Sequence, residues 1–542
     1  MRSTMQTTPL TIASLLRHVD QLHGEREVMT ATTEGVRRST YREVGDRCGR
    51  LANALRSLGV TGDDRVATFQ WNNQEHLESY TAVPAMGAVL HTLNIRLSPD
   101  QVRFIATHAE DKVVVVDSSL VPLFAKILPE LTTVRVVLVT GDGDTAPLEG
   151  HGKEVLRYED ALAAESPEFP WLDGDEDAAG AMCYTSGTTG DPKGVVYSHR
   201  SMYLHSLAAC SGNAFGIAES DRLFPVVPMF HANAWGLPYA AMMAGADLLL
   251  PDRFLQAAPL ADLIHVHRPT IAGAVPTIWN DLLHHVDENK AIDLSSLRLV
   301  ACGGSAVPRA LIEAFDQRFG VTVVQAWGMT ETSPLAAVAR PPAAAAPEEE
   351  MDYRATQGRP VCGVELRIVD DGGTVLPHDG KVAGELEVRG PWITGSYYQK
   401  DSTEQFHNGW LRTGDVGRIS PDGFLTLTDR AKDVIKSGGE WISSVELENL
   451  LMGHPDVVEA AVIAVPDPKW QERPLAAVVL AEGAKTSTAE LRAWLTDKVP
   501  RWWLPERWSF IEQVPRTSVG KFDKKTLRRE YADGGLDVTE TR

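Results

Sequence analysis

Short apolar runs alternate with longer amphipathic stretches through about the first three hundred residues of the chain. Apolar runs of this length are typical of buried strands. Five of them stand out: Lys112–Asp117, Val134–Thr140, Thr270–Pro276, Leu297–Gly304 and Val321–Gly328. Stretches with helical spacing, such as Ser39–Gly59, lie between them. This alternation predicts an α/β fold in which helices cover parallel sheets.

The pattern changes at Val364, where short strands become separated by Asp-Gly pairs at 371–372, 379–380 and 422–423. Asp-Gly between apolar runs is a strong hairpin signal. We therefore expect a small antiparallel subdomain over about residues 364–428. The biased segment Ala339–Asp352 before it is expected to be an exposed loop.

A further unit begins near Arg430–Asp433. Ser443 and Glu446 have the spacing of a capping box for a helix that runs through Leu451. The following pattern predicts strands at Val457–Val465, Leu475–Leu480 and Trp508–Val514 and a helix at Ser487–Lys498. The sequence thus predicts a large N-terminal domain, residues 1–431, and a small α+β C-terminal domain, residues 432–542.

Composition and charge limit the classes of partner that the 542-residue chain is expected to bind. A formal net charge of -21 argues against general nucleic-acid binding and against docking on anionic membranes. The five cysteines are odd in number and form no Cys-x-x-Cys pair, which favours reduced thiols over a disulfide frame or a zinc site. No apolar run approaches the eighteen residues of a membrane span. We expect a cytoplasmic protein; its oligomeric state is left open, with a homodimer as one option.

The stretch YTSGTTGDPKG, from Tyr184 to Gly194, combines three glycines with four serine or threonine hydroxyls and Lys193. Glycine lets backbone N–H groups approach an anion, hydroxyls add donors, and lysine adds charge. A polyphosphate is the predicted ligand, although the spacing differs from the common Gly-x-x-x-x-Gly-Lys-Ser/Thr loop. The alternative is a polar surface turn.

In Gln325–Pro334 a predicted strand ends at Gly328 and is followed by Thr330 and Glu331. Ligands of open parallel sheets bind beyond the carboxyl ends of strands, so a nucleotide is expected here. Thr330 would donate to a phosphate, and Glu331 would hold Mg²⁺ with Thr185 as another oxygen ligand. The alternative is a helix start capped by Thr330.

Three other stretches carry candidate chemistry. The glycines of Ala301–Pro308 would let a flat ring lie against the backbone, with Trp327 over its other face, or they form an ordinary strand–helix turn. Asp415 would accept both ribose hydroxyls, or it only forms a turn. Lys521 would neutralise charge that develops at phosphorus, or it belongs to a solvated basic run.

Five motifs together resemble those of the adenylate-forming superfamily, which includes acyl-CoA synthetases, amino-acid adenylation domains and beetle luciferases. These motifs are YTSGTTGDPKG, WGMTE, GWLRTGD, TDRAKD and PRTSVGK, and the match runs from about Ser39 to Leu527. Two more stretches, IKSGGEWISSVELE and PMFHANAWGLPYA, are most similar to bacterial medium- and long-chain fatty acyl-CoA synthetases. Ligases for methylthiopropionate or aryl acids share much of this pattern.

The resemblance implies a two-step reaction. A carboxylate attacks the α-phosphorus of Mg·ATP to give acyl-adenylate and pyrophosphate, and the thiol of coenzyme A then displaces AMP. Lys521 would be the lysine of adenylation, and Mg²⁺ would be held by Glu331 and Thr185. The residues expected to hold ATP or AMP are Thr185, Ser186, Gly187, Thr188, Thr189, Gly190, Lys193, Gly303, Gly304, Ser305, Ala306, Gln325, Ala326, Trp327, Gly328, Thr330, Asp415, Arg430, Lys432, Lys436 and Trp441.

The resemblance also implies that the C-terminal domain is mobile and swings about Lys432. One orientation brings Lys521 to the carboxylate, and the other forms a tunnel for pantetheine. Gly438 and Gly439 suit such a narrow channel because a Cβ would obstruct it.

The acid is expected between His231–Gly236, Ala272–Trp279 and the strand that ends at Gly303. We place His231 at the reaction centre as a gate, with Phe230; a catalytic base and a packing histidine are the alternatives. The pocket residues are Ala232, Trp235, Gly236 and Ala274. Neither His231–Gly236 nor Ala272–Trp279 contains a lysine or arginine to pair a second carboxylate, which predicts an apolar, medium- to long-chain fatty acid.

Several other functions are also compatible with the sequence. A short thioether or aryl acid could replace the fatty acid as substrate. The adenylate could instead pass to a carrier protein, or be oxidised as in a luciferase-like monooxygenase. A binding protein without catalysis is disfavoured because Lys521, Glu331 and Asp415 are all present.

Overall fold

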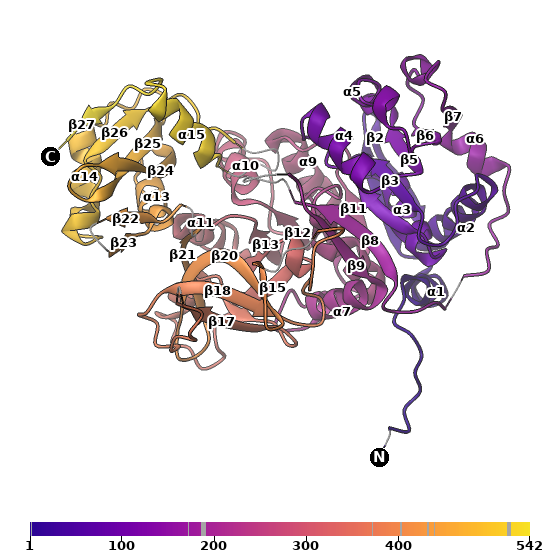
Figure 1. The fold of residues 1–542 in the computed structure, drawn as a ribbon, viewed down its shortest axis with the longest axis horizontal. Coiled ribbons are helices and arrows are strands. Elements are labelled where there is room, and N and C mark those ends of the chain that lie inside the picture. The colour runs from indigo at the N-terminus through magenta and orange to yellow at the C-terminus, as the bar shows by residue number, and fades with distance from the viewer. Residues whose placement is uncertain are drawn as a thin grey trace.

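A computed structural model describes residues 1, 3–171, 173–185, 191–370, 372–400, 404–430, 433–437, 440–516 and 522–541, and for residues 430, 436, 440 and 441 it describes the backbone alone. Within these residues the strands form four sheets. Figure 1 shows the C-terminal domain at one end of the molecule and the antiparallel subdomain beside it. The predicted α/β class, with a large N-terminal and a small C-terminal part, is confirmed.

The nine-stranded sheet has the order β16-β15-β14-β13-β12-β10-β11-β1-β2. Its strands from β14 to β1 run parallel, while β2, β15 and β16 pair antiparallel at its two edges. The bounds are β1 Glu27–Thr32, β2 Gly35–Thr40, β10 Arg222–Pro225, β11 Asp247–Leu250, β12 Ile271–Ala274, β13 Leu299–Gly303, β14 Thr322–Gly328, β15 Leu335–Val338 and β16 Arg359–Pro360.

The seven-stranded sheet has the order β7-β6-β5-β3-β4-β8-β9 and is parallel apart from β9. Its bounds are β3 Arg65–Phe69, β4 Val89–Thr92, β5 Val113–Asp117, β6 Val136–Thr140, β7 Glu154–Arg157, β8 Ala179–Tyr184 and β9 Gly194–Ser198. Strand β8 leads into the glycine-rich loop and β9 leads out of it. The pairing Tyr184↔Gly194 therefore brings the two ends of that loop together.

Helices lie between and outside these sheets. Every residue of α3 is buried, and this helix contacts β1 of one sheet and β3, β4 and β8 of the other, so it lies between the two layers. The helices of this part are α1 Ile12–His23, α2 Tyr41–Ser57, α3 Gln74–Ala85, α4 Pro99–His108, α5 Val121–Phe124, α6 Tyr158–Ala163, α7 His199–Cys210, α8 Leu237–Ala244, α9 Ala257–His267, α10 Pro276–Glu288, α11 Arg309–Phe319 and α12 Glu350–Arg354. No helix of the described residues is long and apolar enough to cross a bilayer.

The expected antiparallel subdomain is present. Its sheet has the order β17-β18-β20-β19, and β21 also pairs with β20. The bounds are β17 Glu365–Val369, β18 Gly384–Arg389, β19 Phe406–His407, β20 Trp410–Ile419 and β21 Leu425–Arg430. Gly380 and Gly423 have φ of 72° and 88°, as their Asp-Gly turns require. The segment expected to be a loop over Ala339–Asp352 ends in α12, which begins at Glu350.

The C-terminal domain has a sheet of order β23-β22-β25-β26-β27, and β24 pairs with β25. Ser443 caps α13 by accepting from the Glu446 backbone N–H at 3.1 Å, which is the N-cap half of the expected capping box. The bounds are β22 Ile435–Ser437, β23 Glu440–Ile442, α13 Ser444–Met452, β24 Val457–Asp467, β25 Gln471–Leu480, α14 Thr488–Thr496, β26 Arg507–Phe510, α15 Lys524–Ala532 and β27 Thr539–Glu540. The boundary at residues 431/432 stays a prediction.

Candidate active site between the two domains

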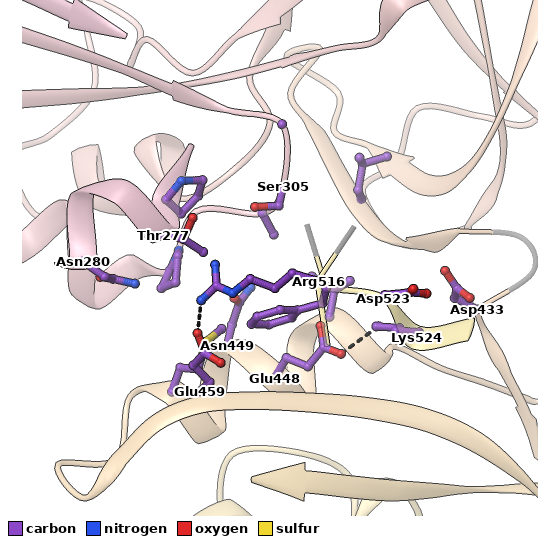
Figure 2. A pocket seen from close by; sticks show the side chains of 18 of the residues that line it. Thr277, Asn280, Ser305, Asp433, Glu448, Asn449, Glu459, Arg516, Asp523 and Lys524 are labelled. Carbon is purple, nitrogen blue, oxygen red and sulfur yellow. Dashed lines mark hydrogen bonds and ion pairs between the residues drawn. The ribbon is translucent and has the colours of Figure 1, made fainter. Parts of the chain in front are cut away.

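A cavity of about 630 Å³ opens where the C-terminal domain faces the carboxyl end of β14. One side of it, the nucleotide floor, consists of Gly304, Ser305, Ala306, Gln325, Ala326, Trp327, Gly328 and Asp415. The opposite side, the charged face, consists of Asp433, Glu448, Glu459, Arg516, Lys524 and Arg528. Figure 2 shows Ser305 across the cavity from Arg516, Glu448 and Lys524. The structure thus brings together predicted nucleotide residues from three separate motifs.

Trp327 and Asp415 join two sheets at this floor. The Trp327 indole Nε1–H donates to Asp415 Oδ2 at 3.0 Å, and both side chains are buried. Trp327 belongs to β14 of the nine-stranded sheet, whereas Asp415 belongs to β20 of the antiparallel subdomain. The hydrogen bond therefore places the carboxylate beside the end of the parallel sheet, where a ribose is expected.

Gln325 holds the floor together through its side-chain amide. Its Oε1 accepts from the Val307 backbone N–H at 2.9 Å, and its Nε2 donates to the Thr356 carbonyl at 2.7 Å. The side chain is 1% exposed, so both ends of the amide are engaged within the protein. Gln325 thereby fixes the loop after β13, which carries Gly304, Ser305 and Ala306.

The last residues of β13 and β14, Gly303 and Gly328, have no room for a Cβ. A Cβ at Gly303 would lie 2.5 Å from the Ala326 carbonyl oxygen, and one at Gly328 would lie 1.8 Å from that of Pro334. Gly304 has a φ of 84°, which strongly favours glycine. These glycines let neighbouring backbone segments meet at the sheet edge. Binding of an adenine ring against them stays a prediction.

Glu331 is buried and forms a polar contact with Tyr397. Its Oε1 accepts from the Tyr397 hydroxyl at 2.7 Å, and the Thr330 carbonyl accepts from the Tyr197 hydroxyl at 2.7 Å. The Thr330 side chain does not cap the short 3-10 turn Thr330–Thr332, so the capping alternative finds no support in the geometry. Sequence reasoning missed Tyr397, because a tyrosine in an irregular loop carries no motif of its own.

Lys193, near the C-terminal end of the glycine-rich loop, also contacts Tyr397. Its Nζ lies 4.7 Å from the centroid of the Tyr397 ring. Burial lowers the pKa of Lys193, nearby Lys400 lowers it further, and Glu331 opposes both. The Lys193 ammonium thus lies beside the face of the Tyr397 ring, and its pKa is influenced by the Glu331 carboxylate. This arrangement suits an anionic ligand that binds together with a metal cation.

Thr185 closes the base of the loop. Its backbone N–H donates to the Lys193 carbonyl at 2.9 Å, and its Oγ1 accepts from the Lys193 N–H at 3.3 Å. The Thr185 hydroxyl and the Glu331 carboxylate are both hard oxygen ligands of the kind that Mg²⁺ prefers, and Mg²⁺ commonly adds waters and phosphate oxygens to one or two such groups. The residues present therefore fit the expected ion in chemical type.

Ion pairs dominate the charged face. Lys524 lies 2.7 Å from Glu448, Arg528 lies 2.6 Å from Asp433, and Arg516 pairs with Glu459. Burial raises the pKa of Glu448 to about 7, although Lys524 opposes the shift. For Lys524 burial lowers the pKa, but Glu448 and Asp429 together raise it above its ordinary value. The lysine ammonium is thus retained by its partners.

Several predicted residues lie outside the described part of the chain: Ser186, Gly187, Thr188, Thr189, Gly190, Lys432, Gly438, Gly439 and Lys521. For three more the backbone alone is described. Arg430 is opposite Asp415 in the β20–β21 pair, and Lys436 is opposite Trp441 in the β22–β23 pair. The roles of all these residues stay predictions.

The expected gate leads into a left-handed turn. His231 is half-buried, and the five residues after it, Ala232–Gly236, have φ of 43°, 47°, 49°, 57° and 68°. Each non-glycine residue in this region costs roughly 1–2 kcal/mol, so the surrounding structure must hold the turn in place. Sequence reasoning did not find this turn, because only its last residue is a glycine.

Trp235 lies over the ends of two strands. A Cβ at Gly303 would lie 3.7 Å from its indole, and one at Gly273 would lie 3.9 Å from it. Ala274 instead packs in a core cluster with Trp279, since successive side chains of a strand point to opposite faces. Of the four predicted acyl-pocket residues, Trp235 thus lies at the strand ends, while Ala274 belongs to the other side of the sheet.

Helix α10 also contributes side chains that the sequence analysis did not name. Thr277, Asn280, Asp281 and His284 line the cavity from this helix, and Arg96 lines it from the segment before α4. Figure 2 shows Thr277 and Asn280 near the guanidinium of Arg516. Thr277, Asn280 and His284 are spaced three and four residues apart, as residues on one face of a helix are. This spacing is the sequence signal that could have identified them.

Comparisons with known proteins agree with this geometry. The sequence profile of AMP-binding enzymes matches residues 16–398, and that of the AMP-binding enzyme C-terminal domain matches residues 446–521. The chain is 45% identical over 538 residues to the 3-methylmercaptopropionyl-CoA ligase of Ruegeria pomeroyi, covering 98% of this chain and 99% of the relative. It is 44% identical over 538 residues to the medium-chain-fatty-acid–CoA ligase of Ectopseudomonas oleovorans, covering 98% of each chain.

A relative from Thermus thermophilus, a long-chain-fatty-acid–CoA ligase, is 46% identical over 537 residues, covering 98% of this chain and 97% of the relative. Among solved structures, the anthranilate CoA ligase AuaEII in complex with anthranoyl-AMP matches with a TM-score of 0.88 at 26% identity, covering 99% of this chain and 100% of that one. The two profiles match in the expected order, and the relatives match over nearly the whole length of the chain. The chain belongs to the family of AMP-binding enzymes.

Proposed function

We propose that this enzyme is an ATP-dependent acid–CoA ligase that activates a medium- to long-chain fatty acid as acyl-AMP, with release of pyrophosphate, and transfers the acyl group to coenzyme A. The observation that carries the proposal is the cavity itself. Its floor contains the predicted nucleotide residues, and its opposite side belongs to the domain that carries Lys521. Relatives at 44–46% identity that are named acid–CoA ligases support it.

Each residue of the site would have a separate role in the reaction. Asp415 would accept the ribose hydroxyls, and the glycine-rich loop with Lys193 would hold the β- and γ-phosphates. Lys521 would place its charge on the atoms that become negative as the carboxylate attacks phosphorus. Mg²⁺, bound through Glu331 and Thr185, would supply neutralisation of phosphate charge. The acid needs no base, because a carboxylate is ionised at neutral pH.

The surroundings of Trp235 favour an aliphatic acid. Its ring lies against the glycines at the ends of β12 and β13, so small residues flank a large apolar wall. An aliphatic chain buried there would gain roughly 0.8 kcal/mol per methylene until the pocket is full, whereas a charged tail would lose its hydration without a partner. Affinity should therefore rise with chain length.

A short thioether acid is the second candidate, because the relative from Ruegeria pomeroyi is named for 3-methylmercaptopropionate and is as similar as the two fatty-acid ligases. Such an acid would need a shallower pocket. Trp235 is the side chain whose position would separate the two substrates.

The test is pyrophosphate release across straight-chain acids of about two to eighteen carbons and 3-methylthiopropionate, with and without coenzyme A. We expect the highest kcat/KM among medium and long fatty acids and thioester only with coenzyme A. Trp235→Ala should move the optimum to longer chains. A maximum at acetate or an amino acid would contradict the fatty-acid assignment. Absence of both pyrophosphate and thioester with every acid would contradict the ligase itself.

A further inference from the structure

The left-handed turn Ala232–Gly236 is anchored by the side chain of Asn233. This residue is 5% exposed, and its Oδ1 accepts from the Cys183 thiol at 3.0 Å and from the Thr92 hydroxyl at 3.2 Å. The Tyr80 hydroxyl lies 3.5 Å from the same oxygen and donates to the Met229 carbonyl. Polar side chains thus converge on one amide oxygen beneath the turn.

The partners of Asn233 belong to the seven-stranded sheet and the buried helix. Cys183 lies on β8, Thr92 ends the adjacent strand β4, and Tyr80 lies on α3. Burial raises the pKa of Cys183 to about 11, so its thiol keeps the proton and donates it at neutral pH. The turn itself connects to α8 and lies near the nine-stranded sheet. The hydrogen bonds of Asn233 therefore connect the turn to the seven-stranded sheet.

The residue type fits both requirements of this position. Asparagine is among the non-glycine residues that enter the left-handed region most readily, and its amide oxygen can accept two hydrogen bonds. Asn233 has φ 47° and ψ 47°. Trp235 follows two residues later with φ 57°, so the direction of its ring depends on the dihedrals that Asn233 holds in place.

We propose that Asn233 is a positioning residue that sets the depth of the acyl pocket by fixing Trp235 over Gly273 and Gly303. The inference rests on the proposed function, because it concerns the acid that the ligase accepts. It goes further in assigning chain-length selection to a side chain outside the pocket wall. The Asn233 amide acts through the turn, and its hydrogen-bond partners Cys183, Thr92 and Tyr80 lie outside the nucleotide floor.

The experiment compares Asn233→Gly with Asn233→Ala in the full-length enzyme, using the acid series above. Both variants lose the amide, but glycine accepts the left-handed backbone. We expect Asn233→Gly to raise KM for the best acid about tenfold and to move the optimum by at least two carbons, with KM for ATP within about twofold of wild type. Asn233→Ala should show the same shift with lower thermal stability. A wild-type length profile in Asn233→Gly would overturn the proposal.

Matched variants of the partner separate anchoring from loss of stability. Cys183→Ser keeps a donor to Asn233 and should keep the wild-type optimum, whereas Cys183→Ala removes the donor and should shift it in the direction of Asn233→Gly. Gln70→Ala removes a buried amide that bonds Thr140 on the same sheet, and it should lower stability without moving the optimum. Equal profiles for the two Cys183 variants would overturn the proposal. If wild-type enzyme formed no adenylate with any acid, the proposed function would fail instead.

Discussion

The two sides of the cavity are built from different interactions. On the nucleotide floor the contacts are hydrogen bonds between elements that lie far apart in the chain, such as Trp327 with Asp415 and Gln325 with Thr356. On the charged face the contacts are ion pairs, and each joins two residues of the C-terminal domain: Lys524 with Glu448, Arg528 with Asp433 and Arg516 with Glu459.

This difference determines which contacts a movement of the C-terminal domain would break. Breaking the floor would leave buried donors and acceptors without partners, which costs about 1–3 kcal/mol for each group. If the C-terminal domain moves as predicted, the three ion pairs of the charged face would stay intact, because none of them crosses to the floor. The hydrogen bonds of Ser443 and Ser444 to Thr428 and Asp429 would have to break. A fixed nucleotide site with an exchangeable opposite side is what a two-step reaction on one adenylate requires.

The largest effect is expected from Lys521→Ala. The lysine is needed only while negative charge gathers at phosphorus, so kcat for adenylation should fall about 100- to 1,000-fold. Thioester formation from supplied acyl-adenylate should stay near wild type. The measurement is single-turnover kinetics of each half-reaction, with the exposed Lys485→Ala as control. Equal loss in both half-reactions would show that the lysine has no role specific to adenylation.

Gly439→Leu should separate the half-reactions in the opposite sense. A branched side chain would obstruct the passage for pantetheine, so thioester formation should fall about 100-fold while pyrophosphate release stays within about threefold. Gly439→Ala should give an intermediate loss. Unchanged turnover with coenzyme A in the leucine variant would contradict the tunnel.

Asp415→Ala should affect both half-reactions, since the floor serves both. The variant removes the acceptor for ribose and leaves the buried Trp327 Nε1–H without its partner, so KM for ATP should rise about 10- to 100-fold. Asp415→Asn retains one oxygen acceptor and should lose less. A loss confined to the thioester step would contradict a common nucleotide floor.

The smallest effect concerns pH and the charged face. The pKa of Glu448 is about 7 in the folded enzyme and ordinarily about 4.3, so the folded state binds more protons between these values. The unfolding free energy should therefore fall as pH rises from about 5 to 8, by about 2 kcal/mol. Glu448→Gln cannot titrate and should remove this slope in chemical denaturation. Glu490→Gln, at an exposed helix cap, is the control, and an unchanged slope in Glu448→Gln would contradict the assignment.

The residues predicted for the nucleotide floor do lie together, because their motifs come at strand ends, where a parallel sheet gathers side chains at one edge. That they bind a nucleotide stays a prediction. The strand predicted at Val321–Gly328 is β14, observed at Thr322–Gly328, and residues of three separate motifs meet at its end. The family and the reaction class were likewise confirmed, because several ordered motifs are specific together.

Other features depend on side-chain direction, which local pattern does not encode. Ala274 lies on the opposite face of β12 from Gly273, and small residues in a row gave no sign of which faces the acid. The amide of Gln325 is occupied by the Val307 N–H and the Thr356 carbonyl, partners that become visible only once the chain has folded. The left-handed turn before Trp235 is similarly a product of tertiary contacts.

The contact between β21 and α13 has a consequence for protein engineering. The Ser444 backbone N–H donates to Asp429 Oδ2 at 2.9 Å, and the Ser443 hydroxyl donates to the Thr428 carbonyl. The first turn of a C-terminal helix is therefore completed by residues on the N-terminal side of residues 431/432. A chimera of two relatives joined at that point would combine a helix from one parent with a cap from the other, so a compatible module should begin before Thr428.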